Sequence, residues 1–173
     1  MNPLPDLSLL CDQIVERLQG CAELAPLSAE GYSAIVGVND EELMEKERAA
    51  LARFGLCVAV RIERAVPVSR RDAKILYDPV ELLVEISERV PLNATTPASQ
   101  PPGLGTGLPA WAVADRVYAA LTNWSPQKLK TPFPLTARPP GLEDHTPKEE
   151  ARRGLKCVRL HLQTACRGEE RSA

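Results

Sequence analysis

The chain has 173 residues, of which 44% are hydrophobic and 25% charged, and its formal net charge is −2. This length and composition fit one globular domain with a buried core, and the charge balance argues against a general duplex-binding surface, which needs net basic charge. No apolar run approaches the roughly 20 residues that cross a bilayer, and the N-terminus lacks the basic-then-apolar pattern of a signal peptide, so we expect no membrane partner.

Aromatic residues make up only 4% of the chain, so the core must be built from aliphatic side chains. The number of cysteines is odd and none forms a C-x-x-C pair. Free thiols in a reducing compartment are therefore the simplest interpretation. The cysteines are Cys11, Cys21, Cys57, Cys157 and Cys166.

The N-terminal half predicts two helices and two strands. Residues 6–19 carry Leu7, Leu10, Ile14 and Leu18 at helical spacing. A short strand is expected over 32–38. A second helix should begin at Asn39 as its N-cap, with Glu42 three residues on, and stop at the left-handed Gly55. A strand over 56–62 follows at once.

The C-terminal half predicts a strand over 80–87, a helix from Pro109 and a strand over 155–165. The helix carries an inner stripe of Ala110, Val113, Val117, Leu121 and Trp124. Residues 63–79, 91–109 and 125–147 are expected to be long connections, with a possible edge strand near 133–137 that its prolines weaken. The domain is expected to span 1–166, and the polar residues 167–173 are expected to be a disordered tail.

Both central strands alternate with period two. Their even-numbered residues are apolar, which predicts a sheet face covered by helices. The expected fold is a two-layer α+β domain, with about three helices mainly on one face of a four- to five-stranded mixed or antiparallel sheet. The element order is α-β-α-β-β-α-(β)-β.

The opposite sheet face combines an apolar centre with a charged rim, which is the composition of a protein–protein interface. A symmetric homo-oligomer is the economical way to cover it. Glu81 and Glu85 should pair across strands with Arg61 or Arg159. The candidate interface residues are Cys57, Ala59, Arg61, Leu83, Glu85, Arg159 and His161.

Two basic clusters follow the strands, and solvated loops are their simplest interpretation. The first is a candidate partner loop with Arg64, Arg70, Arg71 and Lys74; the second holds Arg152, Arg153 and Lys156. A contact with an acidic protein or with passing nucleic acid is the functional alternative. No interleaved aromatic residues are present to stack bases, and no sequence-specific nucleic-acid binding is expected.

Chemical sites find little support in the sequence. Zinc needs three or four converging ligands, and Cys57, Cys157, His161 and His145 make a weak set. No G-x-S-x-G turn suggests a nucleophile. Gly103, Gly105 and Gly107 precede a helix, so a small ligand- or nucleotide-binding protein is an alternative function, although the phosphate-loop lysine is missing. We expect neither an enzyme nor a cofactor.

Several runs resemble the tail terminator (tail completion) proteins of long-tailed bacteriophages and prophages. They are Leu51–Arg61, Val80–Ile86, Pro91–Asn93 and Trp111–Trp124, and the resemblance spans roughly residues 35–165. The proline-rich segments 97–107 and 132–147 have no counterpart in it. Another head–tail connector protein would suit the same pattern.

The resemblance implies a structural, non-enzymatic α+β subunit of a ring, commonly a hexamer. That ring stops polymerisation of the tail tube and docks it to the head. The implied partners are further copies of the chain, the tail-tube protein and a head-completion protein. The implied location is the bacterial host cytoplasm during assembly and then the virion tail.

Overall fold

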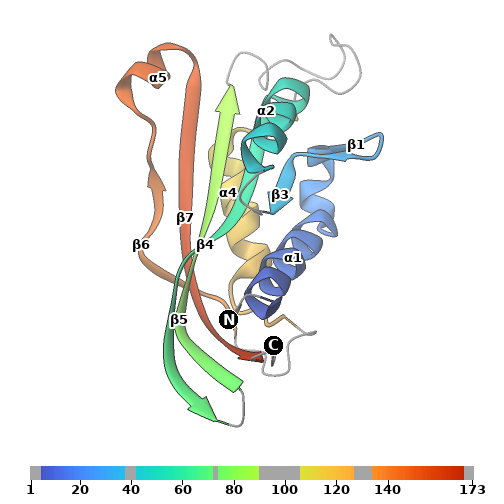
Figure 1. Cartoon of the computed structure of the whole chain (residues 1–173). Helices are drawn as coiled ribbons and strands as arrows, with labels where there is room; N and C mark the ends of the chain where they lie inside the picture. Colours follow the sequence, from blue (N-terminus) through green and yellow to red (C-terminus); the bar gives the residue numbers. More distant parts are fainter. Residues whose placement is uncertain (1–4, 38–41, 72–73, 90–105, 127–133, 170–173) are drawn as a thin grey trace.

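The computed structural model describes residues 5–37, 42–71, 74–89, 106–126 and 134–169, and the fold is a mixed α+β domain (Figure 1). Its main sheet has five strands in the order β3-β4-β5-β7-β6. These strands are β3 (Ile35–Gly37), β4 (Leu56–Arg71), β5 (Lys74–Arg89), β6 (Thr136–Asp144) and β7 (Leu155–Glu169). All neighbours are antiparallel except β3 and β4, which are parallel.

The main helices are α1 (Pro5–Gln19), α2 (Leu43–Phe54) and α4 (Ala110–Leu121). Smaller elements are the 3-10 helix η1 (Ala22–Leu27), the strands β1 (Ser28–Ala29) and β2 (Tyr32–Ser33), and the short helix α5 (Lys148–Arg152). None of these small elements was predicted as such, and the expected strand over 32–38 is divided between β2 and β3. No helix in the described part of the chain is both long and apolar enough to cross a membrane.

The predicted core face is confirmed. The predicted even-numbered residues of the central strands are buried, among them Val58 and Val84, except Ile62, which is only partly buried. The predicted stripe of α1 is buried, and so is that of α4 as far as Leu121; Trp124 is partly buried and lies beyond the end of α4.

Helix α1 approaches β3 closely because Gly37 has no side chain; a Cβ there would lie 3.1 Å from Val15 Cγ2. Since Gly37 pairs in register with Val60, α1 lies on the even-numbered face.

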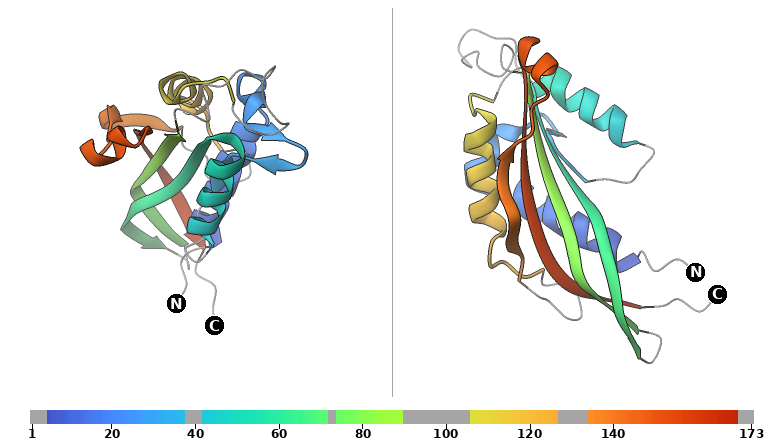
Figure 2. Two further views of the ribbon diagram at one scale, coloured as in Figure 1. Left: turned by 90° about the horizontal axis from the view of Figure 1, so that it is seen from above. Right: turned by 90° about the vertical axis from the view of Figure 1, so that its left-hand side faces the viewer.

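The expected mixed α+β fold with about three helices is confirmed, but α2 lies on the other face of the sheet (Figure 2). Parallel strands cannot be joined by a tight turn, so the chain must cross over between β3 and β4, and α2 makes that crossover. Figure 2 shows α2 and α4 on opposite sides of the strands. The odd-numbered residues Cys57 and Ala59 are accordingly only 1% and 2% exposed.

The segment 63–79, expected to be a loop, forms most of a long hairpin. Strands β4 and β5 are 16 residues each and pair as far as Arg71 opposite Lys74. Register shifts near Glu63, Val66 and Val68 bend β4, and a proline within the run, Pro67, lies among them. These irregularities hide the period-two pattern from which a strand is predicted.

Two further boundaries differ from expectation. Strand β7 continues to Glu169, three residues into the predicted tail, because Lys74 and Ile75 of β5 pair with it. The edge strand exists as β6 but runs over 136–144. Gly55 ends α2 in the left-handed conformation at φ 70°, as predicted, whereas the Asn39 cap lies outside the described residues.

Candidate protein interface

Glu85 is the centre of the charged part of the odd-numbered sheet face. Its Oε2 accepts hydrogen bonds from Arg159 Nε at 2.7 Å and from Arg61 Nη2 at 3.2 Å. Arg159 stands directly opposite Glu85 in the register, and Arg61 lies on the diagonal. The predicted cross-strand pairing is therefore confirmed for Glu85, whose carboxylate is shared between two guanidinium groups. Glu81 instead pairs with Arg64, so the predicted pairing of Glu81 with Arg61 or Arg159 is wrong.

The apolar centre of this face is already covered within the chain. Leu83 is fully buried, as are Cys57 and Ala59. Burial raises the pKa of Glu47 on α2, with repulsion from Glu85 adding to the effect, so α2 brings a carboxyl group over this face. That the candidate interface residues bind a partner stays a prediction. In this conformation the buried residues Cys57, Ala59 and Leu83 cannot contact one.

A second ion pair spans the face between its outer strands. Arg138 of β6 bonds Glu63 of β4, although β5 and β7 lie between those strands. Such a reach requires the sheet to curl, as its outline in Figure 2 shows. The pair helps to close off the centre of the face, because Arg138 is only 16% exposed at its side chain.

The edge strand β6 is attached to β7 through polar contacts. His161 is 7% exposed, and its Nε2 lies 2.9 Å from Glu143 Oε1. This hydrogen bond is the main reason that the pKa of Glu143 is lowered. The pKa of Asp144 is lowered as well, chiefly because its carboxylate accepts hydrogen bonds from the hydroxyl and the backbone N–H of Thr146.

The cysteines near this face are poor nucleophiles. Burial is the first cause that raises the pKa of Cys157 to about 11, and the charge of Glu85 is the second. Burial also raises the pKa of Cys57 far above its ordinary value, and that of Cys11 to about 12. These thiols stay protonated at neutral pH, which disfavours nucleophilic attack and metal ligation.

The proposed metal ligands do not converge. Cys157 and Cys57 share one row of the sheet with Ser87 between them, whereas His161 pairs with Leu83 further along. His145 is exposed. Within the described ranges, no group of three or more His, Cys, Asp or Glu residues could hold a metal ion.

The glycine-rich segment precedes α4, but a carboxylate already occupies the start of that helix. Glu88 Oε2 accepts the Ala110 N–H at 2.5 Å, and Glu88 is 4% exposed. A phosphate would have to displace this internal anion. Gly107 has φ +67°, while Gly103 and Gly105 lie outside the described residues.

The candidate partner loop is the hairpin end of β4 and β5 rather than a loop. Arg64 makes two 3.1 Å hydrogen bonds to Glu81, so its charge is neutralised locally. Arg70, Arg71 and Lys74 lie at the far end of the hairpin. Sequence reasoning missed this arrangement because a bulged strand containing Pro67 does not show strand periodicity.

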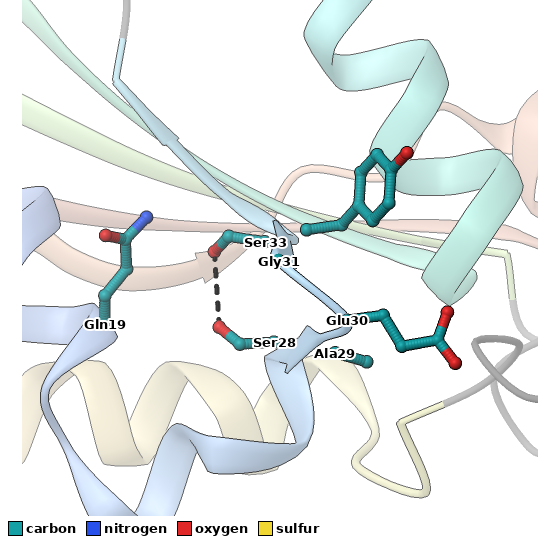
Figure 3. Close-up of a pocket in the computed structure, with 7 residues that line it drawn as sticks. Gln19, Ser28, Ala29, Glu30, Gly31 and Ser33 are labelled. Carbon is teal, nitrogen blue, oxygen red and sulfur yellow. Dashed lines mark hydrogen bonds between the residues drawn. The ribbon is translucent and has the colours of Figure 1, made fainter.

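The surface of the described residues is hollowed at the β1–β2 turn and between α1 and α4. The first, of about 400 Å³, lies at the β1–β2 turn and is lined by Gln19 and by residues 28–33 (Figure 3). Beside it, the Arg53 guanidinium stacks 3.8 Å from the Tyr32 ring and bonds Glu30 at 3.0 Å. The second, of about 350 Å³, lies between α1 and α4. Neither presents converging reactive groups.

The comparison with solved structures gives a match that bears on the fold. A protein chain from the virion of a native gene transfer agent particle has a similar structure, with a TM-score of 0.55 and 16% sequence identity. The match covers 94% of this chain and 97% of that one. This chain has the fold of a virion subunit. No protein-family model and no curated protein matches the sequence.

Proposed function

We propose that the chain is a structural subunit of a phage-like virion, namely a tail-terminator-like ring subunit that caps the tail tube and docks it to the head. The observation that carries this proposal is the structural likeness to a virion chain over nearly the full length of both proteins. Because the match covers nearly all of both chains, few residues of this chain lie outside the shared fold. We infer that this chain also acts by assembling into a virion.

The chemistry of the described residues supports assembly rather than catalysis. The carboxylate at the centre of the charged face, Glu85, is held by Arg61 and Arg159. The neighbouring thiols are protonated because burial raises the pKa of Cys57 and Cys157. A nucleophile is activated by an adjacent base or by a lowered pKa. On this face the pKa values of the thiols are raised instead.

The partners in this proposal are further copies of the chain, the tail-tube protein and a head-completion protein. Assembly would take place in the host cytoplasm, and the chain would end in the virion tail. No cofactor has a role in this function.

The test is to add the purified chain to polymerising tail-tube protein from the same phage or prophage. We expect shorter tubes with a ring at one end by negative-stain electron microscopy, and light scattering should give a multiple of 18.9 kDa, with six copies expected. An unrelated protein of similar mass serves as control. Tubes of unchanged length without end rings, together with a monomeric chain, would rule the proposal out.

A further inference from the structure

The outer side of helix α4 carries exposed aromatic residues, although only 4% of the chain is aromatic. Trp111 and Tyr118 are each 39% exposed, and Asp115 is exposed between them. Because they are four and three positions apart, these three residues share one side of the helix, and we call them the α4 face. Tryptophan and tyrosine are enriched among the residues that carry most of the binding energy of an interface. Their placement here indicates a contact surface.

Asp115 is the charge of α4 that has no partner in the described part of the chain. The other charged residue of the helix is engaged, because Arg116 donates from Nη1 to the Glu23 carbonyl at 2.6 Å. Asp115 lines the hollow between α1 and α4. Arg17, which lines the same hollow, donates from Nε to the Ala120 carbonyl at 3.3 Å. With the described residues, Asp115 forms neither a hydrogen bond nor an ion pair.

The outer side of α2 has the same arrangement with the opposite charge. Met44 is 63% exposed, Arg48 is exposed and Leu51 is partly buried. The set, which we call the α2 face, repeats the spacing of the α4 face. In both, an apolar residue is followed four positions on by a charged residue and three positions further by a second apolar one.

Arg48 is the cation of α2 that no described residue neutralises. Lys46 pairs with Glu42 at 3.2 Å, and Arg53 pairs with Glu30 at 3.0 Å. Among the residues that the structure describes, none forms a hydrogen bond or an ion pair with the Arg48 guanidinium. The two faces therefore present opposite and unpaired charges, each between two apolar side chains.

From this complementarity we infer that the α4 face of one copy packs on the α2 face of the next copy, with Asp115 opposite Arg48. The inference rests on the proposed ring function and names the contact between its subunits. Helices α2 and α4 lie on opposite sides of the strands (Figure 2), so one copy cannot bring its own two faces together. A contact between two different surfaces is heterologous, and such contacts generate closed rings when the rotation permits.

The two faces match in length and in chemistry. Each helix has 12 residues and is therefore about 18 Å long. The charged residue is the middle member of each face, so Asp115 meets Arg48 whether the helices run parallel or antiparallel. In either direction an aromatic ring of the α4 face lies against Met44, whose sulfur makes favourable contacts with such rings. The apolar residues on both sides exclude water from the charge pair and strengthen it.

Reversing either charge should prevent assembly, because like charges facing each other at a subunit contact repel. We expect Asp115→Lys and, separately, Arg48→Glu to weaken ring formation at least about tenfold, as followed by light scattering with and without tail-tube protein. The matched controls are Asp12→Lys on α1 and Arg152→Glu on α5, which make the same charge changes at exposed positions outside both faces. They should assemble like the wild type, and circular dichroism should show that all four variants are folded.

Mixing the two charge-reversed variants tests whether the contact is heterologous. The Asp115→Lys copy keeps Arg48, and the Arg48→Glu copy keeps Asp115. Every contact between unlike copies therefore regains opposite charges, whereas every contact between like copies repels. We expect neither variant alone to form a ring and the equimolar mixture to form one with alternating copies.

The chain that carries both substitutions, Asp115→Lys/Arg48→Glu, should also assemble, because its charges are exchanged and remain opposite. This second variant covers a ring with an odd number of copies, in which alternation is impossible. If neither the mixture nor the doubly substituted chain recovers, the contact is wrong.

The remaining outcomes separate this contact from the ring function. A ring that persists in both single variants removes the contact and leaves the ring function standing. A wild-type chain that never assembles removes both. If the single variants form rings but no longer bind tail-tube protein in a pull-down, the two faces contact that protein and the inference is wrong.

Discussion

At the scale of single residues, Glu85 holds the charged face together. Its carboxylate is shared by Arg61 and Arg159, and its side chain is 16% exposed. Removing one member of a half-buried charge network leaves the remaining charges desolvated and unpaired. An exposed pair on the same sheet, Arg64 with Glu81, has an arginine that is 62% exposed and should matter far less.

We therefore expect Glu85→Gln to lower the free energy of unfolding by about 1–3 kcal/mol. Glu81→Gln is the matched control and should lower it by less than about 1 kcal/mol. Urea unfolding of the three proteins measures both values. Equal losses would show that the shared carboxylate has no special role.

At the scale of elements, α2 determines which sheet residues are surface and which are core. Its crossover between the parallel strands β3 and β4 places it on the face opposite α4 (Figure 2), whereas α1 lies on the even-numbered face. Ala59 consequently lies between a strand and a helix and is 2% exposed. The packing at position 59 therefore leaves room only for a small side chain.

Ala59→Leu should destabilise the protein by about 1–3 kcal/mol, because an enlarged side chain in a close-packed layer forces its neighbours to move. Ala52→Leu on the exposed side of α2 is the control and should be neutral within about 0.5 kcal/mol. Thermal and urea unfolding give both values. A neutral Ala59→Leu would mean that α2 does not cover this face.

The β6–β7 edge should be sensitive to acid. The folded-state pKa values of Glu143 and Asp144 are lowered from 4.5 and 3.8, first by the His161 and Thr146 hydrogen bonds respectively. A lowered folded pKa contributes stability above the unfolded value, and this contribution is lost as the pH falls through the folded value. The loss should therefore occur below about pH 4.5.

Glu143→Gln/Asp144→Asn should remove part of this acid dependence. We expect its melting temperature to fall less steeply than that of the wild type between about pH 4.5 and pH 2.5. The exposed substitutions Glu149→Gln/Glu150→Gln are the control and should keep the wild-type slope. Parallel slopes in all three proteins would contradict this assignment.

At the scale of the whole molecule, folding and assembly should be separable. The core lies where the helices meet the sheet, whereas the end of the β4–β5 hairpin, which we call the arm, extends beyond them (Figure 2). Ile75 and Leu76, near the end of the arm, are only partly buried, and Ile75 packs against the core. The arm can therefore be shortened at the loss of a partly buried core contact.

Replacing residues 69–76 with a two-residue Asn-Gly turn should lower the free energy of unfolding by about 1–3 kcal/mol, because it removes the core contact of Ile75, and should leave the protein folded. Assembly with tail-tube protein should nevertheless be lost. Circular dichroism melting and light scattering measure the two properties on the same sample. An assembled ring of arm-shortened chains would show that the arm is dispensable.

The sequence by itself determined the local elements with strong periodicity and clear stops. The stripes of α1 and α4, the Gly55 stop and the buried even-numbered strand residues all follow from side-chain spacing and from backbone conformations that few residues tolerate. The Glu85 pairing followed as well, since alternation and strand order fix which charges face each other.

Only the tertiary structure decided what covers each face. Period-two alternation shows that a residue points to one side of a sheet, but not whether a helix, an ion pair or a partner lies there. The crossover of α2 buried Cys57 and Ala59, and the curl of the sheet let Arg138 reach Glu63. These contacts join residues far apart in the chain, so no local pattern encodes them.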